Sequence, residues 1–132
     1  MNIKTIHFLT QLKNASSLNK EMVKVDCNRF IINILKLLYE EGFILGFKIN
    51  KKANFYNETS EAIVYLRYMH NKPILKNLKI ISSPSLQRVI RLKELCRIIA
   101  KKKFFLFSTN LGLLTLTECK KNHVGGVLLF SC

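Results

Sequence analysis

The sequence has few acidic residues, 8 Asp and Glu against 22 Lys and Arg, which leaves a formal net charge of +14 in a chain of 132 residues. Such an imbalance indicates a polyanionic partner. Long apolar runs are also lacking, since runs such as 104–107 and 127–130 have only four residues each. A membrane-spanning helix needs about 18. The sequence therefore predicts no membrane partner.

Metal and disulfide patterns are missing as well. The four cysteines contain no CxxC pair and fit no zinc spacing, so we expect free thiols in a reducing compartment, with no metal and no cofactor. Cys119 and His123 come closest to a Cys/His nucleophile pair, but no oxyanion-hole loop accompanies them. We interpret them as two exposed surface residues and expect no small-molecule substrate.

What the chain does have is enough apolar material for a core, 48% hydrophobic and 10% aromatic residues. Its charge is uneven. Residues 1–66 carry 9 basic and 6 acidic side chains, whereas residues 67–132 carry 13 and 2. Lysine supplies 17 of the 22 basic residues, and Asn, Ile and Phe are abundant, a bias typical of an AT-rich genome. The polyanion is therefore expected to bind mainly to the second half.

Hydrophobic periodicity predicts an α/β arrangement in the first half. Apolar residues recur every three positions over 5–16, which predicts a helix, and a short strand follows over 22–25. A second, strongly amphipathic helix begins after a cap at Asp26 or Asn28 and ends at Gly42. The period then changes to two, which predicts a hairpin whose return strand begins at 62 and whose first strand buries Phe43, Leu45, Phe47 and Ile49.

The sequence at 70–73 interrupts both patterns and marks a junction. Beyond it, short strands are predicted at 78–81, 89–90, 104–108, 113–115 and 127–131, with helical turns at 93–100 and 118–122. We therefore predict an α+β fold of two small lobes. Residues 1–72 form an N-terminal α/β lobe of two helices on a small sheet with a hairpin, and residues 73–132 form a mainly β lobe with short helical turns.

Five segments, in order along nearly the whole chain, resemble the small-subunit ribosomal protein S8 family in its bacterial and organellar form. Residues 12–15 (Leu-Lys-Asn-Ala) resemble Ile-Arg-Asn-Ala of its first helix, and residues 25–44, which end in Glu-Glu-Gly-Phe-Ile, are similar to its helix ending Lys-Glu-Glu-Gly-Tyr-Ile. Residues 82–89 are similar to its Ser-Arg-Pro-Gly-Leu-Arg-Val turn, and residues 108–115 to its signature Ser-Thr-Ser-Lys-Gly-Val-Met-Thr. Residues 124–126 stand where Gly-Val-Gly-Gly-Glu is expected.

The chain also departs from this pattern. Val127 replaces the glutamate after the two glycines, Leu111 the lysine of the signature, His123 the glycine before Val124, and Leu116 an aspartate. The early Asp-Pro is missing near Thr5. Because the glycines and the Ser-Thr pair survive, we expect the backbone shape of the loop to persist while some polar interactions disappear.

The resemblance implies a non-catalytic protein that binds the central domain of small-subunit ribosomal RNA early in assembly. Neighbouring small-subunit ribosomal proteins are its expected partners, and we expect no homo-oligomer. The resemblance begins within the first dozen residues and leaves no room for a transit segment, which together with the AT-rich bias favours an organelle-encoded mitochondrial copy, with a plastid second and a bacterium with a reduced genome third. A non-ribosomal RNA-binding module, such as a translational regulator or an RNA maturation factor, is the alternative.

Small hydroxyl and amide side chains on a tight loop suit RNA, whose recognition concentrates on irregular loops and on 2′-hydroxyls in the shallow minor groove. Lys79 and Arg91 are further candidates for phosphate contacts. The lysine cluster 101–103 is either a phosphate clamp or a loop that solubilises the apolar run 104–107. The glycine pair 125–126 is either a tight turn or a point of close approach to RNA. The predicted RNA-binding residues are Ser108, Thr109, Asn110, Gly112, Thr115, Gly125, Gly126, Ser82, Arg88, Lys76, Lys13, Asn14 and Arg29.

Overall fold

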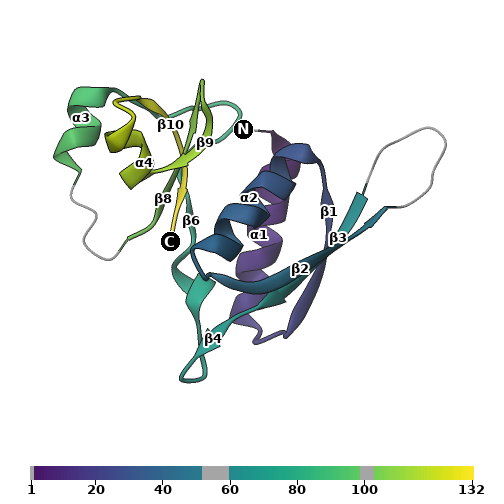
Figure 1. The fold of residues 1–132 in the computed structure, drawn as a ribbon. Helices are drawn as coiled ribbons and strands as arrows, with labels where there is room; N and C mark the ends of the chain where they lie inside the picture. The colour runs from purple at the N-terminus through teal and green to yellow at the C-terminus, as the bar shows by residue number, and fades with distance from the viewer. Residues whose placement is uncertain (1, 52–59, 99–102) are drawn as a thin grey trace. The chain divides into compact units, whose positions relative to one another are not determined.

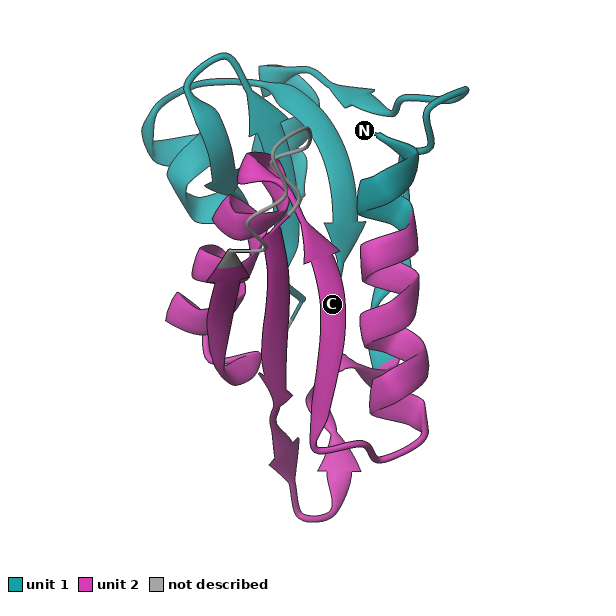
Figure 2. Cartoon of the chain, turned by 90° about the vertical axis from the view of Figure 1, so that its right-hand side faces the viewer, with its two compact units in different colours: residues 1–6, 77–132 teal, residues 7–76 magenta. Residues whose placement is uncertain are grey.

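The computed structural model describes residues 2–51, 60–98 and 103–132, and its α+β fold confirms the predicted class (Figure 1). The chain forms two compact units (Figure 2). We call residues 7–76 the N-terminal unit and residues 77–132, together with 1–6, the C-terminal unit. Among the described residues, no helix combines the length and the apolar character that crossing a membrane requires.

The N-terminal unit contains two helices and a three-stranded sheet. Helix α1 (Ile3–Ser17) buries Phe8, Leu9 and Leu12, and its first turn is counted with the C-terminal unit. Helix α2 (Arg29–Glu40) begins after Asn28, whose side-chain oxygen accepts a hydrogen bond from the Ile31 amide at 2.9 Å. Asn28, and not Asp26, is therefore the cap. Gly42 follows the helix with φ +77°, a conformation that favours glycine.

The sheet of this unit is antiparallel, in the order β1-β3-β2, and consists of β1 (Met22–Cys27), β2 (Ile44–Lys51) and β3 (Ser60–Leu66). One face packs against α1 and α2 and buries Val25, Ala62 and Val64 (Figure 1). The register places Phe47 and Ile49 on this face, where Phe47 is half-buried. The prediction that Ile49 is buried is wrong, because its side chain is 39% exposed. The prediction for Leu45 is wrong, because a bulge between 44 and 46 buries Ile44 and leaves Leu45 63% exposed.

A small hairpin follows the sheet. Strands β4 (Tyr68–Met69) and β5 (Lys72–Pro73) pair across His70 and Asn71, which both have positive φ. Two such residues make the hairpin turn whose twist matches that of the flanking strands. A 3₁₀ turn, η1 (Ile74–Asn77), then leads to the C-terminal unit. The predicted lobe boundary after residue 72 stays a prediction.

The C-terminal unit is built on a five-stranded antiparallel sheet in which β10 (Gly126–Ser131) pairs with three strands. These are β6 (Lys79–Ile80), β7 (Val89–Ile90) and β8 (Phe105–Thr109). Strand β9 (Gly112–Thr115) completes the sheet beside β8. Two short helices, α3 (Leu92–Arg97) and α4 (Leu116–Lys121), lie between the strands in sequence, so the predicted succession of elements is confirmed.

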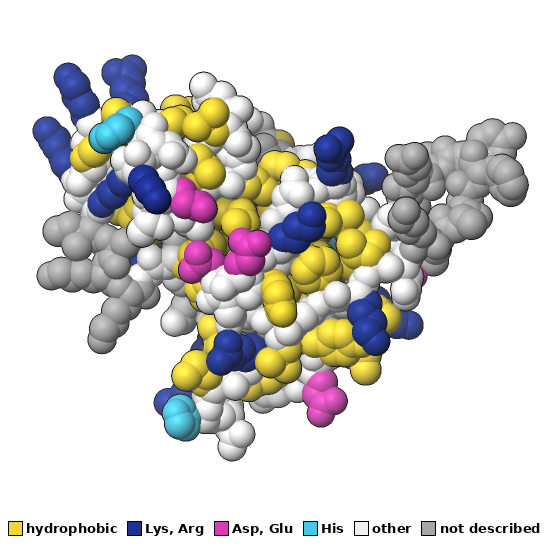
Figure 3. Space-filling model, viewed as in Figure 1, with side chains coloured by type: hydrophobic (Ala, Val, Ile, Leu, Met, Phe, Trp, Pro, Cys, Tyr) yellow, Lys and Arg dark blue, Asp and Glu magenta, His cyan; other side chains and the backbone are white. Residues whose placement is uncertain are grey.

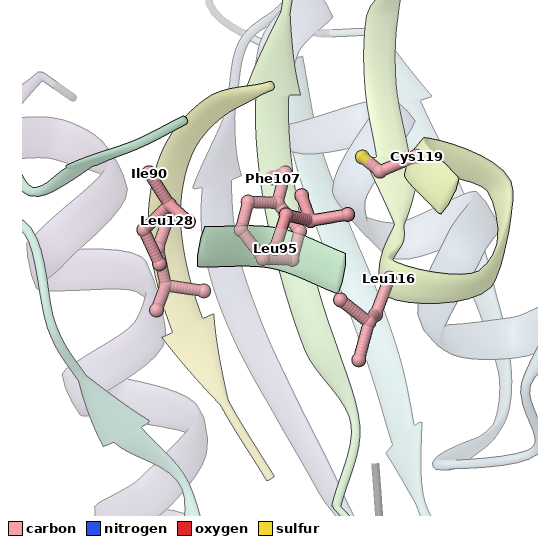
Figure 4. Close-up of a cluster of buried hydrophobic side chains, with 6 residues drawn as sticks. All are labelled: Ile90, Leu95, Phe107, Leu116, Cys119 and Leu128. Carbon is pink, nitrogen blue, oxygen red and sulfur yellow. The ribbon is translucent and has the colours of Figure 1, made fainter. Parts of the chain in front are cut away.

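Helices α3 and α4 cover one face of this sheet. Leu95 of α3 and Leu116 of α4 pack with side chains of β7, β8 and β10 in a buried cluster (Figure 4). Phe107 is fully buried in it and pairs across the sheet with Leu128. Because successive side chains of a strand alternate between faces, the residue after Phe107 points to the opposite face. The helices thus fix which residues of β8 remain available to a partner.

All four cysteines are free thiols, as predicted. The expectation that Cys119 is exposed is wrong, because its side chain completes the buried cluster of the C-terminal unit. The sequence around it is polar and rich in lysine, but α4 is amphipathic and turns Cys119 and Leu116 toward the sheet. His123 is exposed, as expected.

Candidate nucleic-acid interface

The face of the five-stranded sheet opposite α3 and α4 carries Ser108. The pairing register sets Val89, Val127, Ser108 and Leu113 side by side across four strands. We call these four residues the Ser108 row. Ser108, Val127 and Leu113 are half-buried, whereas Val89 at the edge is 62% exposed. The Ser108 hydroxyl makes no hydrogen bond within the described parts of the chain, so one unpaired polar group lies on an otherwise apolar, accessible strip.

The hairpin of β8 and β9 places three further candidates beside this row. The Thr109 hydroxyl donates to the Gly112 carbonyl at 2.9 Å and accepts from the Leu111 amide at 3.2 Å, so it holds the turn together. Gly112 has φ +111°, which explains the surviving glycine of the signature. Asn110 at the tip is exposed. The structure therefore leaves Asn110 accessible and commits Thr109 and Gly112 to the shape of the loop.

Ser82 and Arg88 belong to the turn before β7. Ser82 is fully buried, and its hydroxyl donates to the Leu128 carbonyl and accepts from the Arg88 amide at 3.1 Å. The Leu128 amide in turn donates to the Arg88 carbonyl at 2.9 Å. These bonds fasten the turn to β10. The Arg88 side chain is exposed, and Val89 of the Ser108 row follows it directly in sequence.

Thr115 is the cap of α4, and it is buried. Its hydroxyl and the Glu118 carboxylate form a reciprocal capping box, in which the Glu118 side chain accepts from the Thr115 amide at 2.8 Å. Close packing within the sheet explains why Gly125 and Gly126 are glycines. A Cβ at Gly126 would lie 2.6 Å from the Ser108 carbonyl oxygen, and one at Gly125 would lie 2.8 Å from the Ile90 carbonyl oxygen. Both glycines allow the strands beside Ser108 to approach closely.

The structure also brings together basic residues of which only Arg91 was predicted as a phosphate contact. Five side chains on or next to α3 and α4 form what we call the α3–α4 patch, and Figure 3 shows dark blue side chains over these helices. Lys120 is half-buried, and its ammonium donates to the Ile98 carbonyl at 2.6 Å. The other four are exposed. The sequence signal that could have found this group is the spacing of its basic residues on the two predicted helical turns, 93–100 and 118–122. The patch consists of Arg91, Lys93, Arg97, Lys120 and Lys121.

The other predicted contacts are spread over the chain. Lys13 and Asn14 are exposed on α1, Arg29 is exposed at the start of α2, and Lys76 is exposed on η1, all in the N-terminal unit. Lys79 is exposed on β6. Of the lysine cluster 101–103, residues 101 and 102 lie outside the described residues, and Lys103 is exposed. The structure thus places Ser108, Asn110, Arg88 and Lys79 in the C-terminal unit. It places Lys13, Asn14, Arg29 and Lys76 in the N-terminal unit.

A thiol nucleophile finds no support in this geometry. Burial raises the pKa of the Cys119 thiol, and the neighbouring Glu118 carboxylate raises it further. A thiol with a raised pKa has less of the reactive thiolate at neutral pH. Among the described residues, no three His, Cys, Asp or Glu side chains come together as metal ligands.

Comparison with known proteins gives one consistent family. The family model described as Ribosomal protein S8 matches residues 5–132. The small ribosomal subunit protein uS8 of Malacoplasma penetrans is 31% identical over 92% of this chain and 90% of its own length. The protein uS8 of Phytoplasma mali is 32% identical over 92% of this chain and 89% of its own. The protein uS8m of Acanthamoeba castellanii is 33% identical over 81% of this chain and 80% of its own.

Proposed function

Because the chain belongs to the ribosomal protein S8 family and is a structural constituent of the small ribosomal subunit, we propose that it binds small-subunit ribosomal RNA directly through the Ser108 row. It is not an enzyme. The observation that carries the proposal is the unpaired Ser108 hydroxyl between Val127 and Leu113. The central domain of the RNA is the proposed target.

The chemistry of the row suits the minor groove of an RNA helix or an irregular loop. A serine hydroxyl both donates and accepts, as does a ribose 2′-hydroxyl. The apolar neighbours Val127 and Leu113 offer no competing partner, so a hydrogen bond made there is shielded from water and costly to leave unmade. A ligand must therefore present its hydroxyl or base edge at one position, which gives selectivity for RNA structure.

Around the row we assign two kinds of role. Asn110 and Arg88 are exposed and are proposed to touch RNA. The internal hydrogen bonds of Ser82, Thr109 and Thr115, and the close strand approaches at Gly125 and Gly126, are proposed to hold the surface in shape from beneath. Gly112 does so through its backbone conformation.

Basic side chains supply affinity without selectivity. The α3–α4 patch, Lys79 and Arg88 are proposed to neutralise phosphates, which makes binding fall as salt rises. Lys76, which follows residue 72, is proposed to neutralise a phosphate in the same way, whereas Lys13, Asn14 and Arg29 are proposed to meet a second RNA segment. The chain would then use residues 1–72 and 73–132 as two lobes with different RNA contacts.

The cellular setting is also a proposal. We place the protein in a mitochondrial ribosome, as one copy beside other small-subunit proteins and as an early participant in assembly. The mitochondrial relative of Acanthamoeba castellanii and the AT-rich bias support this location. A plastid is the alternative, and the bacterial relatives are compatible with a reduced bacterial genome. No observation favours a non-ribosomal RNA-binding module.

The direct experiment is sedimentation of cell lysate in a sucrose gradient, with the parent chain and Ser108→Ala in parallel. The parent is expected to peak with small ribosomal subunits, and the variant to shift in part to the top of the gradient. Ser131→Ala is the matched control, because Ser131 lies on the same sheet and points to the helix-covered face with Phe105. A parent protein found mostly free of ribosomal particles would contradict the proposal.

A further inference from the structure

The three-stranded sheet of the N-terminal unit has a face that α1 and α2 do not cover. On this face Tyr65 of the central strand pairs with Met22 of β1 on one side and with Gly46 of β2 on the other. Met22 is 52% exposed, and nothing lies within 4 Å of the position that a Cβ would take at Gly46. The position across from Tyr65 on β2 is therefore open, where a neighbouring side chain would normally stand.

Tyr65 also lines a hollow of about 470 Å³, which we call the tyrosine hollow. The bulge of β2 turns Leu45 outward and makes one wall. Tyr68 makes another, and its hydroxyl donates to the Lys20 carbonyl, so the second ring is held in place. Two aromatic rings and an exposed leucine give this hollow a largely apolar lining. The hollow is lined by Glu21, Leu45, Tyr65, Leu66, Arg67 and Tyr68.

Charges are ordered along the same face. The next ladder position places Lys24 and Lys48 on either side of Ile63, about 6–7 Å from the Tyr65 row because two residues of a strand span that length. One position further, Asp26 and Glu61 pair and end the basic stretch. The face thus runs from an aromatic end through a lysine pair to an acidic end.

We propose that the tyrosine hollow binds one unstacked nucleotide of RNA, with the base against Tyr65 over Gly46 and its phosphate toward Lys24 and Lys48. Stacking on an aromatic side chain stabilises any of the four bases, and lysines draw the backbone. Glu21 and Arg67 both line the hollow, so their opposite charges offset each other there, whereas Lys24 and Lys48 form a pair of like, positive charges that attracts the phosphate. The inference rests on the proposed function only in taking RNA as partner, because it uses a different unit from the Ser108 row.

The test compares three variants of the full chain. Tyr65→Leu removes the ring and keeps an apolar side chain, Gly46→Val fills the open space with a residue that favours strands, and Tyr65→Phe is the matched control that keeps the ring. Each is titrated with single-stranded RNA hexanucleotides and with a fragment of the central domain of small-subunit RNA. Ultraviolet crosslinking of the parent complex, followed by mass spectrometry, locates the contacted peptide. Circular dichroism verifies folding.

We expect Tyr65→Leu and Gly46→Val to bind hexanucleotides about tenfold more weakly, as one base–aromatic stack implies, while Tyr65→Phe binds as the parent does. The crosslink is expected on the peptide containing Tyr65. Unchanged hexanucleotide affinity in Tyr65→Leu overturns the inference. So does unchanged RNA affinity combined with loss of another small-subunit protein from the variant particles, which would assign the hollow to a protein segment.

The two proposals can fail separately. Ser108→Ala is expected to weaken binding of the central-domain fragment and to leave hexanucleotide binding unchanged, because Ser108 lies in the C-terminal unit and the tyrosine hollow in the N-terminal unit. If Ser108→Ala leaves RNA affinity unchanged and Tyr65→Leu lowers it, the result supports the tyrosine hollow as an RNA site and rejects the Ser108 row. The reverse result rejects the hollow alone.

Discussion

The two units pack helices against a sheet in the same way, but they expose different surfaces. Each has an antiparallel sheet with helices against one face, and each exposes part of the other face. In the C-terminal unit that surface is a hydroxyl, Ser108, between apolar neighbours. In the N-terminal unit it is an aromatic ring, Tyr65, beside a glycine and followed by Lys24 and Lys48.

The difference separates two ways of holding RNA. A hydroxyl between apolar neighbours, once RNA covers it, can form a hydrogen bond only with a group at one position, so it discriminates among RNA structures. A ring with lysines beside it accepts any base and any phosphate, so it adds affinity without discrimination. We infer a division of labour in which the C-terminal unit selects the RNA and the N-terminal unit adds sequence-tolerant affinity.

The largest expected effect comes from the same change at two glycines. Gly126→Ala puts a Cβ 2.6 Å from the Ser108 carbonyl oxygen, so β8 and β10 must separate. We expect it to lower the free energy of unfolding by about 3 kcal/mol, as overpacking does. Gly46→Ala meets open space and should cost nothing or stabilise slightly, since alanine is less flexible than glycine in the unfolded chain. Urea unfolding followed by circular dichroism measures both.

Equal stability of the two glycine variants would contradict the close approach of β8 and β10. It would also remove the structural explanation for Gly125 and Gly126. Close approach to RNA would then be the better explanation for these two glycines. Gly126→Ala is further expected to weaken binding of the central-domain RNA fragment, because the Ser108 row depends on that approach.

A smaller effect is expected from the two helix caps, one in each unit. Thr115→Ala and Asn28→Ala each remove a cap hydrogen bond and should each lower the free energy of unfolding by about 1 kcal/mol. Because Thr115 is buried, its variant should keep the RNA affinity of the parent within about twofold where it is fully folded. A large loss of RNA affinity in folded Thr115→Ala would make Thr115 a direct contact.

Charge removal should have a still smaller effect per residue. The double variant Lys93→Ala with Arg97→Ala is expected to weaken all RNAs alike and to lower the slope of log affinity against log salt by up to about 0.7–0.9 for each phosphate that is no longer neutralised. The pair Lys24→Ala with Lys48→Ala is the matching change on the N-terminal unit. Titration at several salt concentrations measures both, and an effect confined to one RNA would contradict a sequence-tolerant role.

Alkylation of thiols should have no effect on RNA binding. Cys96 is exposed and should react with iodoacetamide, whereas Cys27 and Cys119 are buried and burial raises the pKa of both thiols, so little thiolate is present at pH 8. Mass spectrometry follows the labelling of each cysteine, and RNA affinity is measured afterwards. Loss of binding after modification of Cys96 alone would contradict this prediction and give the Cys96 side chain itself a part in RNA binding.

Local patterns predicted much of this fold and less of its surface. Helix α2 was predicted well because an amphipathic stripe, a cap and a terminal glycine agree within one segment. The bulge at Leu45 was missed because alternation over 43–49 continues through it in the sequence, and only pairing with β3 reveals the extra residue. Cys119 was misplaced because its neighbours in sequence are polar, while its neighbours in space are Leu95 and Phe107.

The candidate site depends even more on contacts between distant residues. Ser108 was predicted by resemblance to a family motif, but its place between Val127 and Leu113 follows from the register of three strands. The tyrosine hollow was not predicted, since Tyr65 and Gly46 are 19 positions apart and no local pattern joins them. The engagement of Ser82 with Leu128 spans 46 positions and was equally beyond a local pattern.

The central claim, that RNA is selected at Ser108, is tested most directly by the ratio of two affinities in one variant. Ser108→Ala is titrated with the central-domain RNA fragment and with an unrelated RNA duplex, beside Ser131→Ala as control. We predict a loss of about 1–3 kcal/mol on the fragment, roughly 5- to 150-fold, because a partner group is left unpaired, and no change on the duplex. Equal affinities of parent and variant for both RNAs would contradict the account and move recognition away from the Ser108 row.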